Sequence, residues 1–507
     1  MVDVLVVYLN PVLHPYATPY GASIVLQKLR STGIMSELII PFLDHDPVNS
    51  FKESVQAHKP AIVALSFRNL DDAGCSPESN GEMHYVQVLK DFVTIARESE
   101  TLCVLGGSGF SIAPENILQE TGAELGFVGA CEHEFAEFCS RYLKGISIRE
   151  AISGLASSRV RNCQCPDVSS EVSFPLGQPI HYSPSVIEYV KLCAGVIPVR
   201  TKSGCSNACS YCVASHIESF QLRPWDDIKL ELNNIIDQKL ADRVFIADGE
   251  FNIPNEEYAL SLCKKISASF ADAIKWRCYL IPPHISSELM DSMREAGCVG
   301  VSLSVDSFDS HVLEGYAKKY TPDQAEATIR VCLNAGITPL VTLLFGGPNE
   351  TFATIDRTIE KASQLIGLGA IFTVASGLRV YPNTGLNHIS RQPEYAEFYA
   401  PLKSLPWLGT FSSPCPGAEL HNYLIAKLPP SDNVIYCNMA SNESKEFYSS
   451  LAYGAKLLCE SRSEIAEAYF TKLASKYPES KEVRLGLLKC DVRKMRTDLS
   501  SKNDSRN

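Results

Sequence analysis

Three cysteines, Cys205, Cys209 and Cys212, lie within eight consecutive positions of the stretch TKSGCSNACSYC. Thiolates bind soft metals and hold iron–sulfur clusters, so this C-x3-C-x2-C spacing is the strongest candidate for chemistry in the chain. A cube-shaped 4Fe-4S cluster that is held by three cysteines has one iron without a protein ligand. A small molecule that must bind iron directly can use that open position.

Two other metal sites are possible from the spacing. His216 follows Cys212 and completes a C-x3-C-x2-C-x3-H pattern, which could hold a structural zinc ion. Structural zinc sites usually divide their ligands between two separated pairs, so we favour the cluster. Cys163 and Cys165 in RNCQCPD are a weaker metal candidate, because a one-residue spacing suits no common site.

The composition excludes several classes of protein. A net charge of −12, without a basic stripe interleaved with aromatic residues, argues against a nucleic-acid-binding surface. No apolar run of about 18 residues could span a bilayer. The start MVDVLVVYLNP lacks the basic region and cleavage site of a signal peptide. The 18 cysteines should then remain reduced, which predicts a cytoplasmic protein without a membrane or nucleic-acid partner.

The first 145 residues should form one domain that positions part of the site. Five apolar segments alternate with stretches of helical periodicity, which predicts a doubly wound, Rossmann-like parallel sheet. The segments are 2–10, 36–42, 61–67, 101–107 and 123–129. Ligands of such sheets bind beyond the carboxyl ends of the strands. Residues 146–190 are rich in Ser, Pro and Gly and are predicted to be a linker.

A second alternating series over residues 191–395 should carry the cysteine loop. Its six strand segments predict a partial, TIM-type (β/α)6 barrel whose site lies at the carboxyl ends of the strands. The segments are 195–201, 242–249, 275–281, 298–306, 337–345 and 370–380. Residues 396–495 are predicted to be a mostly helical domain, including a helix over 394–405, and residues 496–507 a disordered tail.

The cysteine loop and the strand ends of this series together resemble the radical S-adenosylmethionine (radical SAM) superfamily. The matching stretches are SYC at the cysteine loop, ADGEFN, SLSVDS, LLFGGPNET and RVYPNTGL, in this order over some 200 residues. The resemblance implies a 4Fe-4S cluster on Cys205, Cys209 and Cys212, with S-adenosylmethionine bound to the open iron. In ADGEFN, Asp248 replaces the first glycine of the family pattern.

The resemblance also implies which residues surround S-adenosylmethionine. An aromatic residue near the adenine, a strand end that contacts the methionine amino group, a ribose-facing strand and a Gly-Pro turn all have counterparts here. These residues are Tyr211, Asp248, Gly249, Glu250, Ser304, Asp306, Gly346, Gly347 and Arg379.

The first domain resembles the cobalamin-binding domain of cobalamin-dependent radical SAM enzymes. The loop LGGSGFSIAPE lacks the third glycine of a dinucleotide fingerprint, which disfavours NAD or FAD. The implied cobalamin contacts are Asn10, Asn69, Gly106, Gly107, Ser108, Gly109 and Gly129. The loop NPVLHPYATPYG departs from the Asp-x-His-x-x-Gly pattern of many such domains, so we expect cobalamin without a ligating His14.

Arg68 is the candidate catalytic residue of this domain. FRNLDD and GGSGFSIAP resemble the tryptophan 2-C-methyltransferase-like subgroup of the family, which implies that Arg68 lies beneath the corrin and disfavours an axial cobalt ligand. The alternative is a surface salt bridge from Arg68 to Asp71 or Asp72.

The resemblance predicts a C-methyltransferase that moves a methyl group from S-adenosylmethionine, via methylcobalamin, to a carbon of a small-molecule or peptide substrate. The transfer could be polar, or could use a 5′-deoxyadenosyl radical. An external electron donor such as flavodoxin or ferredoxin is implied. Three alternatives are a non-methylating radical rearrangement or oxidation, a corrinoid or iron–sulfur sensor without turnover, and a zinc-stabilised interaction protein.

Overall fold

A computed structural model gives the fold of the protein. The structure describes residues 2–11, 17–44, 46–71, 84–153, 155, 160–162, 180–183, 186–187, 190, 196–241, 243–270, 273–283, 285–431, 433–436, 463–478, 483–484, 486–488 and 490. Cys163, Cys165, His14 and Asp72, which the sequence analysis considered, lie outside these residues. Within the described ranges, no helix is long and apolar enough to cross a membrane.

The first sheet has six strands in the order β2-β1-β3-β4-β5-β6. Its parallel strands are β1 (Val4–Leu9), β2 (Ser36–Ile39), β3 (Ile62–Phe67), β4 (Leu102–Gly106) and β5 (Leu125–Phe127). The helices around it are α1 (Tyr20–Ser31), α2 (Pro47–His58), α3 (Val86–Glu98), α4 (Ser108–Ile112), α5 (Pro114–Thr121), α6 (Glu132–Tyr142) and α7 (Ile148–Ser153), with a 3-10 turn at Pro41–Leu43. All five segments predicted as strands are present.

Both faces of this sheet are buried, as a doubly wound sheet requires. Along β1, Leu5 and Val7 belong to one apolar core, and Val4 and Val6 belong to another on the opposite face. Successive side chains of a strand point to opposite faces, so this division follows directly from the continuous apolar run VLVVYL. The prediction of parallel α/β architecture is confirmed.

The sheet continues into the segment that the sequence analysis assigned to a linker. Strand β6 (Val160–Asn162) pairs antiparallel with β5, and α7 precedes it. An edge strand exposes unpaired backbone N–H and C=O groups, and β6 satisfies those of β5. Part of residues 146–190 therefore belongs to the first sheet.

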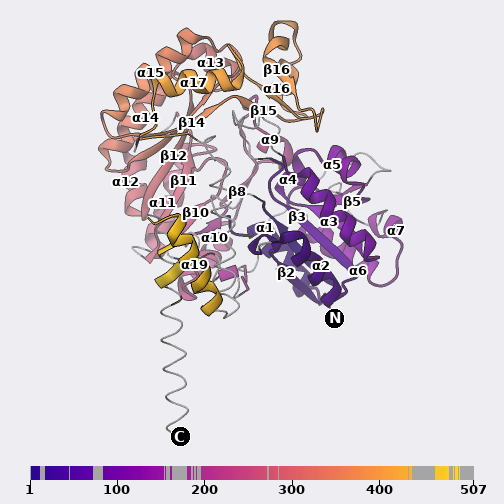
Figure 1. The fold of residues 1–507 in the computed structure, drawn as a ribbon. Helices are drawn as coiled ribbons and strands as arrows, with labels where there is room; N and C mark the ends of the chain where they lie inside the picture. Colours follow the sequence, from indigo (N-terminus) through magenta and orange to yellow (C-terminus); the bar gives the residue numbers. More distant parts are fainter. Residues whose placement is uncertain are drawn as a thin grey trace.

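The second sheet has seven parallel strands in the order β18-β14-β13-β12-β11-β10-β7. The strands are β7 (Val196–Val199), β10 (Arg243–Ile246), β11 (Trp276–Leu280), β12 (Cys298–Asp306), β13 (Pro339–Phe345), β14 (Ile371–Ser376) and β18 (Val434–Tyr436). The helices are α10 (Trp225–Asp237), α11 (Glu256–Phe270), α12 (Ser287–Glu295), α13 (Ser310–Gly315), α14 (Pro322–Asn334), α15 (Phe352–Ile366) and α17 (Gly417–Lys427). Figure 1 shows α11, α12, α14 and α15 along the outer side of this sheet. All six predicted strands are present, and β18 extends the sheet beyond residue 395.

Only one face of the second sheet is fully buried. In every strand, alternate residues are buried against the helices, and those between them are half-buried or exposed. In β11, for example, Trp276, Cys278 and Leu280 are buried, whereas Arg277 and Tyr279 are exposed. We call the face that carries Arg277 and Tyr279 the inner face.

The helix predicted over residues 394–405 is not formed. A 3-10 turn (Pro393–Phe398) leads into β16 (Tyr399–Pro401), which pairs antiparallel with β17 (Gly409–Phe411), and β17 pairs with β15 (Leu378–Val380). Leu402, Leu405 and Leu408 have helix-like spacing, but they pack in the core of the first domain. The spacing of these leucines therefore serves tertiary packing, and no helix forms here.

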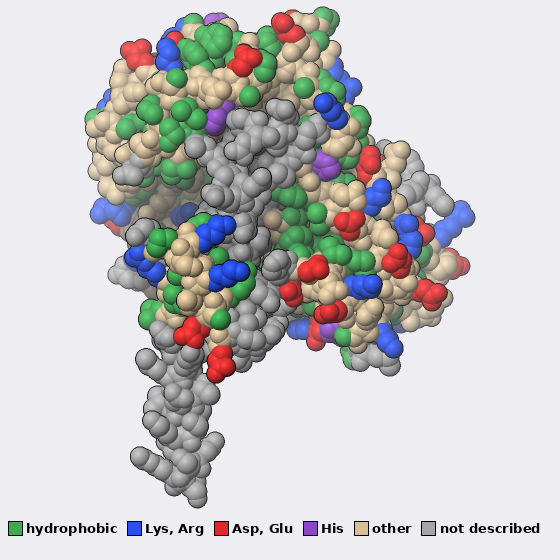
Figure 2. Space-filling view, viewed as in Figure 1, with side chains coloured by type: hydrophobic (Ala, Val, Ile, Leu, Met, Phe, Trp, Pro, Cys, Tyr) green, Lys and Arg blue, Asp and Glu red, His purple; other side chains and the backbone are tan. Residues whose placement is uncertain are grey.

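The C-terminal region contains α19 (Ser463–Lys476), which the sequence predicted. Phe470 and Ala466 pack with Val483 and Cys490 in a small core of their own. The predicted helix over 444–459 and the tail over 496–507 lie outside the described residues. On the face shown in Figure 2, acidic and basic side chains are interspersed over the first domain.

Candidate active site

The three cysteines lie on a short loop, residues 204–213, which we call the cluster loop. It follows β8 (Lys202–Ser203) and precedes α9 (Ala214–Ile217). Ser210 fixes the loop: its N–H donates to the Tyr316 carbonyl (3.1 Å) and its hydroxyl to the Gly315 carbonyl (2.9 Å). The Leu386 N–H donates to the Ser210 carbonyl over 2.6 Å. The loop is therefore held to the C-terminal end of α13 and to the start of α16 (Gly385–Ile389).

The thiols of Cys205, Cys209 and Cys212 are half-buried and close to one another. Burial raises the pKa of each thiol, and each also feels the charge of another of the three. The three cysteines of a cubane cluster bind three different irons, so their sulfurs do not surround a single point. Among the described residues, no group of three His, Cys, Asp or Glu is placed to hold one metal ion, and His216 is exposed on α9.

Glu250 lies after β10 and beside the cluster loop. A Cβ at the neighbouring Gly249 would be 3.8 Å from the Cys205 sulfur, so the backbone passes close to the thiol. The Oε2 atom of Glu250 is buried and accepts no hydrogen bond from the residues that the structure describes. Burial raises the pKa of Glu250 from 4.5 to about 8. An unsatisfied buried carboxylate oxygen suits a cationic ammonium group, so this side chain fits the amino end of S-adenosylmethionine.

Asp248 is engaged by the protein itself. Its Oδ1 accepts from the N–H groups of Thr201 (2.7 Å) and Lys202 (3.2 Å). Its Oδ2 accepts from the Thr201 hydroxyl and pairs with Lys202 Nζ at 3.2 Å. Lys202 Nζ also donates to the carbonyls of Glu250 and Phe251. Asp248 therefore joins the end of β10 to the segment that enters the cluster loop, and positions Glu250 rather than offering a free oxygen.

Tyr211 and Asp306, both predicted site residues, lie together. The Tyr211 hydroxyl donates to Asp306 Oδ2 over 2.5 Å, and Lys318 Nζ pairs with the same oxygen at 2.7 Å. The Lys318 ammonium also lies 5.4 Å from the Tyr211 ring centroid. Asp306 has a left-handed backbone (φ 63°) at the end of β12, close to Ser304.

Lys318 is a site residue that the sequence analysis missed. Its side chain is 2% exposed, and although burial opposes its charge, Asp306 raises the pKa well above 10.5. Its positive charge lowers the pKa of all three cluster-loop thiols, which favours anionic sulfur. No spacing or motif singles out this lysine in GYAKKY, because its partner Asp306 lies in a different element.

The turn after β13 contains Gly346 and Gly347. Gly346 has a φ of 97°, and its N–H donates to Glu350 over 2.9 Å. A Cβ at Gly347 would lie 2.2 Å from the Tyr316 ring, so only glycine permits this packing. The turn therefore depends on Glu350, a buried carboxyl whose pKa burial raises from 4.5 to about 8.

Glu350 should make stability depend on pH. The folded-state pKa lies above the ordinary value, so the folded protein holds a proton that the unfolded chain releases, and stability falls as pH rises from about 5 to about 8. Glu350→Gln removes this titration and keeps an acceptor for the Gly346 N–H. We expect the wild type to lose more thermal stability than Glu350→Gln across this window. Equal changes in Tm would contradict the assignment.

Arg379, at the end of the second sheet's strand series, forms an ion pair with the first domain. Its Nε pairs with Asp71 Oδ2 at 2.9 Å, and the two side chains are 1% and 2% exposed. The Tyr381 hydroxyl donates to Asp71 Oδ1 over 2.9 Å. Asp71 follows the loop after β3, so this buried pair joins the two domains. The contact of Arg379 with S-adenosylmethionine stays a prediction. Trp407 packs against the core of the first domain that also contains Leu402 and Leu405.

The candidate cobalamin residues meet at the carboxyl ends of β1 and β3. Arg68 Nη1 donates to Asn69 Oδ1 (2.8 Å), and Asn69 Nδ2 donates to Asn10 Oδ1 (3.0 Å). The Asn10 Nδ2 atom is buried and finds no acceptor among the described residues. A ligand acceptor at this place would satisfy it, so the crevice fits a polar group of a bound cofactor.

The loop after β4 packs tightly on the Arg68 loop. The Ser108 hydroxyl donates to the Arg68 carbonyl over 2.7 Å. A Cβ at Gly107 or Gly109 would clash with the backbone of Phe67 or of Asn69, at 2.4 and 2.9 Å. These glycines therefore hold the backbone of Arg68 in place. Gly129 donates its N–H to Ser111 (2.9 Å), and Gly106 lies near the carbonyl of Phe127.

Arg68 does not form the predicted alternative salt bridge to Asp71, because Asp71 pairs with Arg379. The Arg68 guanidinium instead influences Tyr8 and Tyr279. Tyr279, on the inner face of the second sheet, also feels the charge of Glu250. The charges of Arg68, a candidate cobalamin residue, and of Glu250, a candidate S-adenosylmethionine residue, therefore both act on Tyr279.

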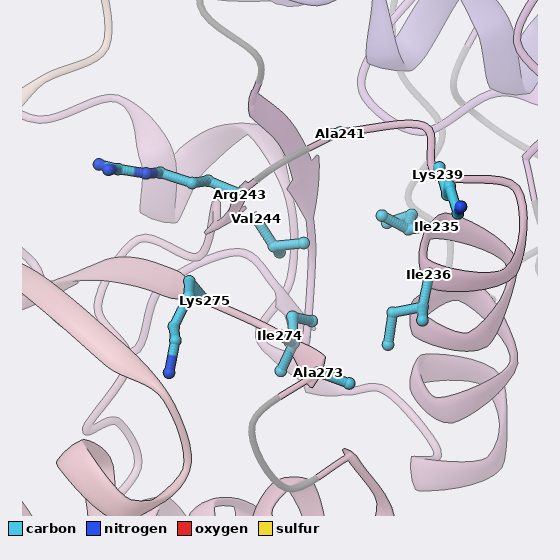
Figure 3. A pocket seen from close by; sticks show the side chains of 9 residues that line it. All are labelled: Ile235, Ile236, Lys239, Ala241, Arg243, Val244, Ala273, Ile274 and Lys275. Carbon is cyan, nitrogen blue, oxygen red and sulfur yellow. The ribbon is translucent and has the colours of Figure 1, made fainter.

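A separate pocket of about 290 Å³ lies at the opposite, amino-terminal end of β10 and β11 (Figure 3). Its apolar wall comes from α10 and the starts of these strands, and Lys239, Arg243 and Lys275 line it. None of the predicted site residues lines this pocket, so it belongs to a different part of the molecule.

Comparison with known proteins shows which proteins this chain is similar to. Residues 199–362 match the model of the radical SAM superfamily. The tryptophan 2-C-methyltransferase of Streptomyces laurentii is 22% identical over 450 residues, 75% of this chain and 73% of that protein. The structure of the radical S-adenosylmethionine methyltransferase TsrM from Kitasatospora setae, with cobalamin and a 4Fe-4S cluster bound, has a TM-score of 0.72 at 20% identity, covering 94% and 100% of the two chains. The cobalamin-dependent S-adenosylmethionine radical enzyme OxsB has a TM-score of 0.64 at 14% identity, covering 98% and 81%.

Proposed function

We propose that this chain, which carries a radical SAM domain and has the fold of cobalamin-dependent radical SAM enzymes, is a C-methyltransferase. It would move a methyl group from S-adenosylmethionine to a carbon of a small-molecule substrate, with cobalamin as carrier. The observation that carries the proposal is the position of Tyr279. The charge of Glu250, beside the cluster loop, and the charge of Arg68, in the first domain, both act on this residue.

The residues of the second sheet would bind and orient S-adenosylmethionine. Cys205, Cys209 and Cys212 hold the cluster, and the Lys318 charge favours their thiolate forms. Glu250 Oε2 accepts from the methionine ammonium. Tyr211, fixed by Asp306, supports the adenine side. When bound, the cluster supplies an electron and cobalamin supplies a methyl-carrying cobalt.

The residues of the first domain would bind cobalamin and control the lower face of cobalt. Asn10 and Asn69 offer amide groups, and Asn69 holds the Arg68 guanidinium. A guanidinium stays protonated in proteins and cannot ligate cobalt. Arg68 would thus lie beside the bound cofactor as a cation that offers cobalt no ligand atom.

Electron paramagnetic resonance of the cob(II)alamin form tests Arg68. We expect no nitrogen hyperfine splitting in the wild type, even with added imidazole, because Arg68 blocks access to cobalt. In Arg68→Ala, added imidazole should ligate and produce the splitting. Arg161→Ala, which removes an arginine paired with Glu115 elsewhere in the first domain, is the control and should match the wild type. Nitrogen splitting in the untreated wild type would contradict the role of Arg68.

The function itself is tested by cofactor content and by labelled methyl transfer. After anaerobic reconstitution, we expect about four irons and one cobalamin per chain, with little zinc. Candidate substrates are then incubated with methyl-deuterated S-adenosylmethionine, a reductant and flavodoxin or ferredoxin as electron donor. A trideuteromethylated product supports the proposal, and the amount of 5′-deoxyadenosine distinguishes the radical from the polar route. Zinc without iron, or iron without cobalt, overturns it.

A further inference from the structure

Within the described part of the chain, the inner face of the second sheet carries side chains that remain half-buried or exposed. All-parallel sheets are normally buried on both faces. Here alternate residues of the strands are half-buried or exposed: Arg277 and Tyr279 are exposed in β11, and Leu340, Thr342 and Leu344 are half-buried in β13. A face of this kind is available to a ligand between the two domains.

One part of this face combines a cation with two aromatic rings. The Arg277 guanidinium lies 5.2 Å from the ring centroid of Phe245, its neighbour in the register of β10 and β11. The rings of Phe245 and Tyr279 meet edge to face, with centroids 5.2 Å apart. Tyr279 follows Arg277 by one pleat, about 7 Å nearer the carboxyl end of β11.

Arg277 has no anionic partner within the described part of the chain. No carboxylate forms an ion pair with it there, whereas other inward or buried cations, such as Lys202 and Lys318, have carboxylate partners at 3.2 and 2.7 Å. An arginine that is exposed on an inner face and stacked on an aromatic ring keeps its donor edge available for a ligand.

Tyr279, together with Phe245 and Arg277, lies near both candidate cofactor sites. The Phe251 N–H donates to the Tyr279 carbonyl over 2.8 Å, which sets Tyr279 level with the residue after Glu250. The charges of Arg277, Glu250 and Arg68 all act on the Tyr279 hydroxyl. A molecule that lies against Tyr279 is therefore within reach of both sites.

We infer that Arg277, Phe245 and Tyr279 form the substrate-recognition site, in which Arg277 binds a carboxylate and the two rings hold a flat, apolar body. The carboxylate lies toward the middle of β11, and the carbon to be methylated lies toward the carboxyl ends of the strands. This inference rests on the proposed methyl transfer, since it names the class of substrate for that reaction.

A carboxylate fits this arginine better than other anions. A guanidinium that is stacked on one ring presents a planar edge with two parallel N–H donors, which matches the two oxygens of a carboxylate. Phe245 and Tyr279 bring no further charge, so the site balances a single negative charge. An aromatic amino acid or a related aromatic acid has this combination of groups.

Equilibrium binding on the full chain, reconstituted with iron, sulfide and cobalamin, tests the inference. The probes are tryptophan, phenylalanine and tyrosine, with tryptamine, phenethylamine and tyramine as matched amines that lack only the carboxylate. We expect at least one acid to bind, and its amine to bind 10- to 100-fold more weakly, as expected for loss of a charged hydrogen-bonded pair. In Arg277→Met, binding of the acid should fall by the same factor and binding of the amine should not change.

Two further variants sharpen the result. Arg277→Lys keeps the charge but loses the planar edge and should bind the acid with intermediate affinity. Arg294→Met removes an exposed arginine of helix α12, which is not on the inner face, and should bind both probes like the wild type. The inference is overturned if no acid binds, if acid and amine bind equally, or if Arg277→Met binds the acid like the wild type. Cofactor content is measured on the same samples, so a failure to take up iron or cobalt counts against the proposed function instead.

Discussion

Cys205→Ala, Cys209→Ala and Cys212→Ala should each abolish cluster assembly and lower methyl transfer by more than ~10³-fold. Each thiolate binds a different iron, and the loop offers no replacement ligand, since His216 is exposed on α9. The cysteines are half-buried on a loop that Ser210 fixes through its own hydrogen bonds, so the fold should persist. Iron and sulfide content, the visible spectrum and labelled methyl transfer measure the effect.

Cys415→Ala is the matched control for these variants. Cys415 is also half-buried, and burial also raises its pKa, but it lies outside the cluster loop. It should retain full iron content and activity. If any one of the three cluster-loop variants kept four irons per chain, the three-cysteine cluster would be excluded.

Arg379→Met should lower the free energy of unfolding by about 3–5 kcal/mol, the usual cost of leaving a buried charge without its partner. Asp71 would stay buried and lose this ion pair, while the Tyr381 hydroxyl still donates to its Oδ1. Asp71→Asn should have an effect of similar size, because it removes the carboxylate charge that pairs with the buried Arg379 guanidinium. The double variant Asp71→Asn/Arg379→Met removes both charges and should recover much of the loss.

Urea denaturation of the four proteins measures this cycle. Arg294→Met is the control: Arg294 pairs with Asp291 on α12, but the two side chains are 58% and 55% exposed. Removing such a surface pair should change stability by less than about 1 kcal/mol. A double variant that is no more stable than Arg379→Met would show that the two charges do not stabilise one another. Because the pair joins the domains, pulsed EPR between cob(II)alamin and the reduced cluster should also give a broader distance distribution in Arg379→Met.

Predictions that depend on local spacing agree with the structure. The five strands of the first sheet and the six predicted strands of the second follow from apolar runs separated by helical periodicity. β12 has the bounds 298–306 that the sequence predicts. The cluster loop is equally local, because its three cysteines lie within eight residues. The prediction of a helix over 394–405 was wrong, because Leu402, Leu405 and Leu408 have helical spacing but pack on the first domain.

The sequence by itself determined the two parallel α/β units, the cysteine loop and the family resemblance, since each depends on residues that are near one another in the chain. Only the tertiary structure decided which polar residues meet. Tyr211 and Asp306 are 95 positions apart, and Tyr381 and Asp71 are 310 apart. The ion pair of Arg379, the charge of Lys318 and the open inner face with Arg277 and Tyr279 depend on strand order and on which face each side chain occupies. Those properties arise from packing between distant segments, which no local pattern in the chain specifies.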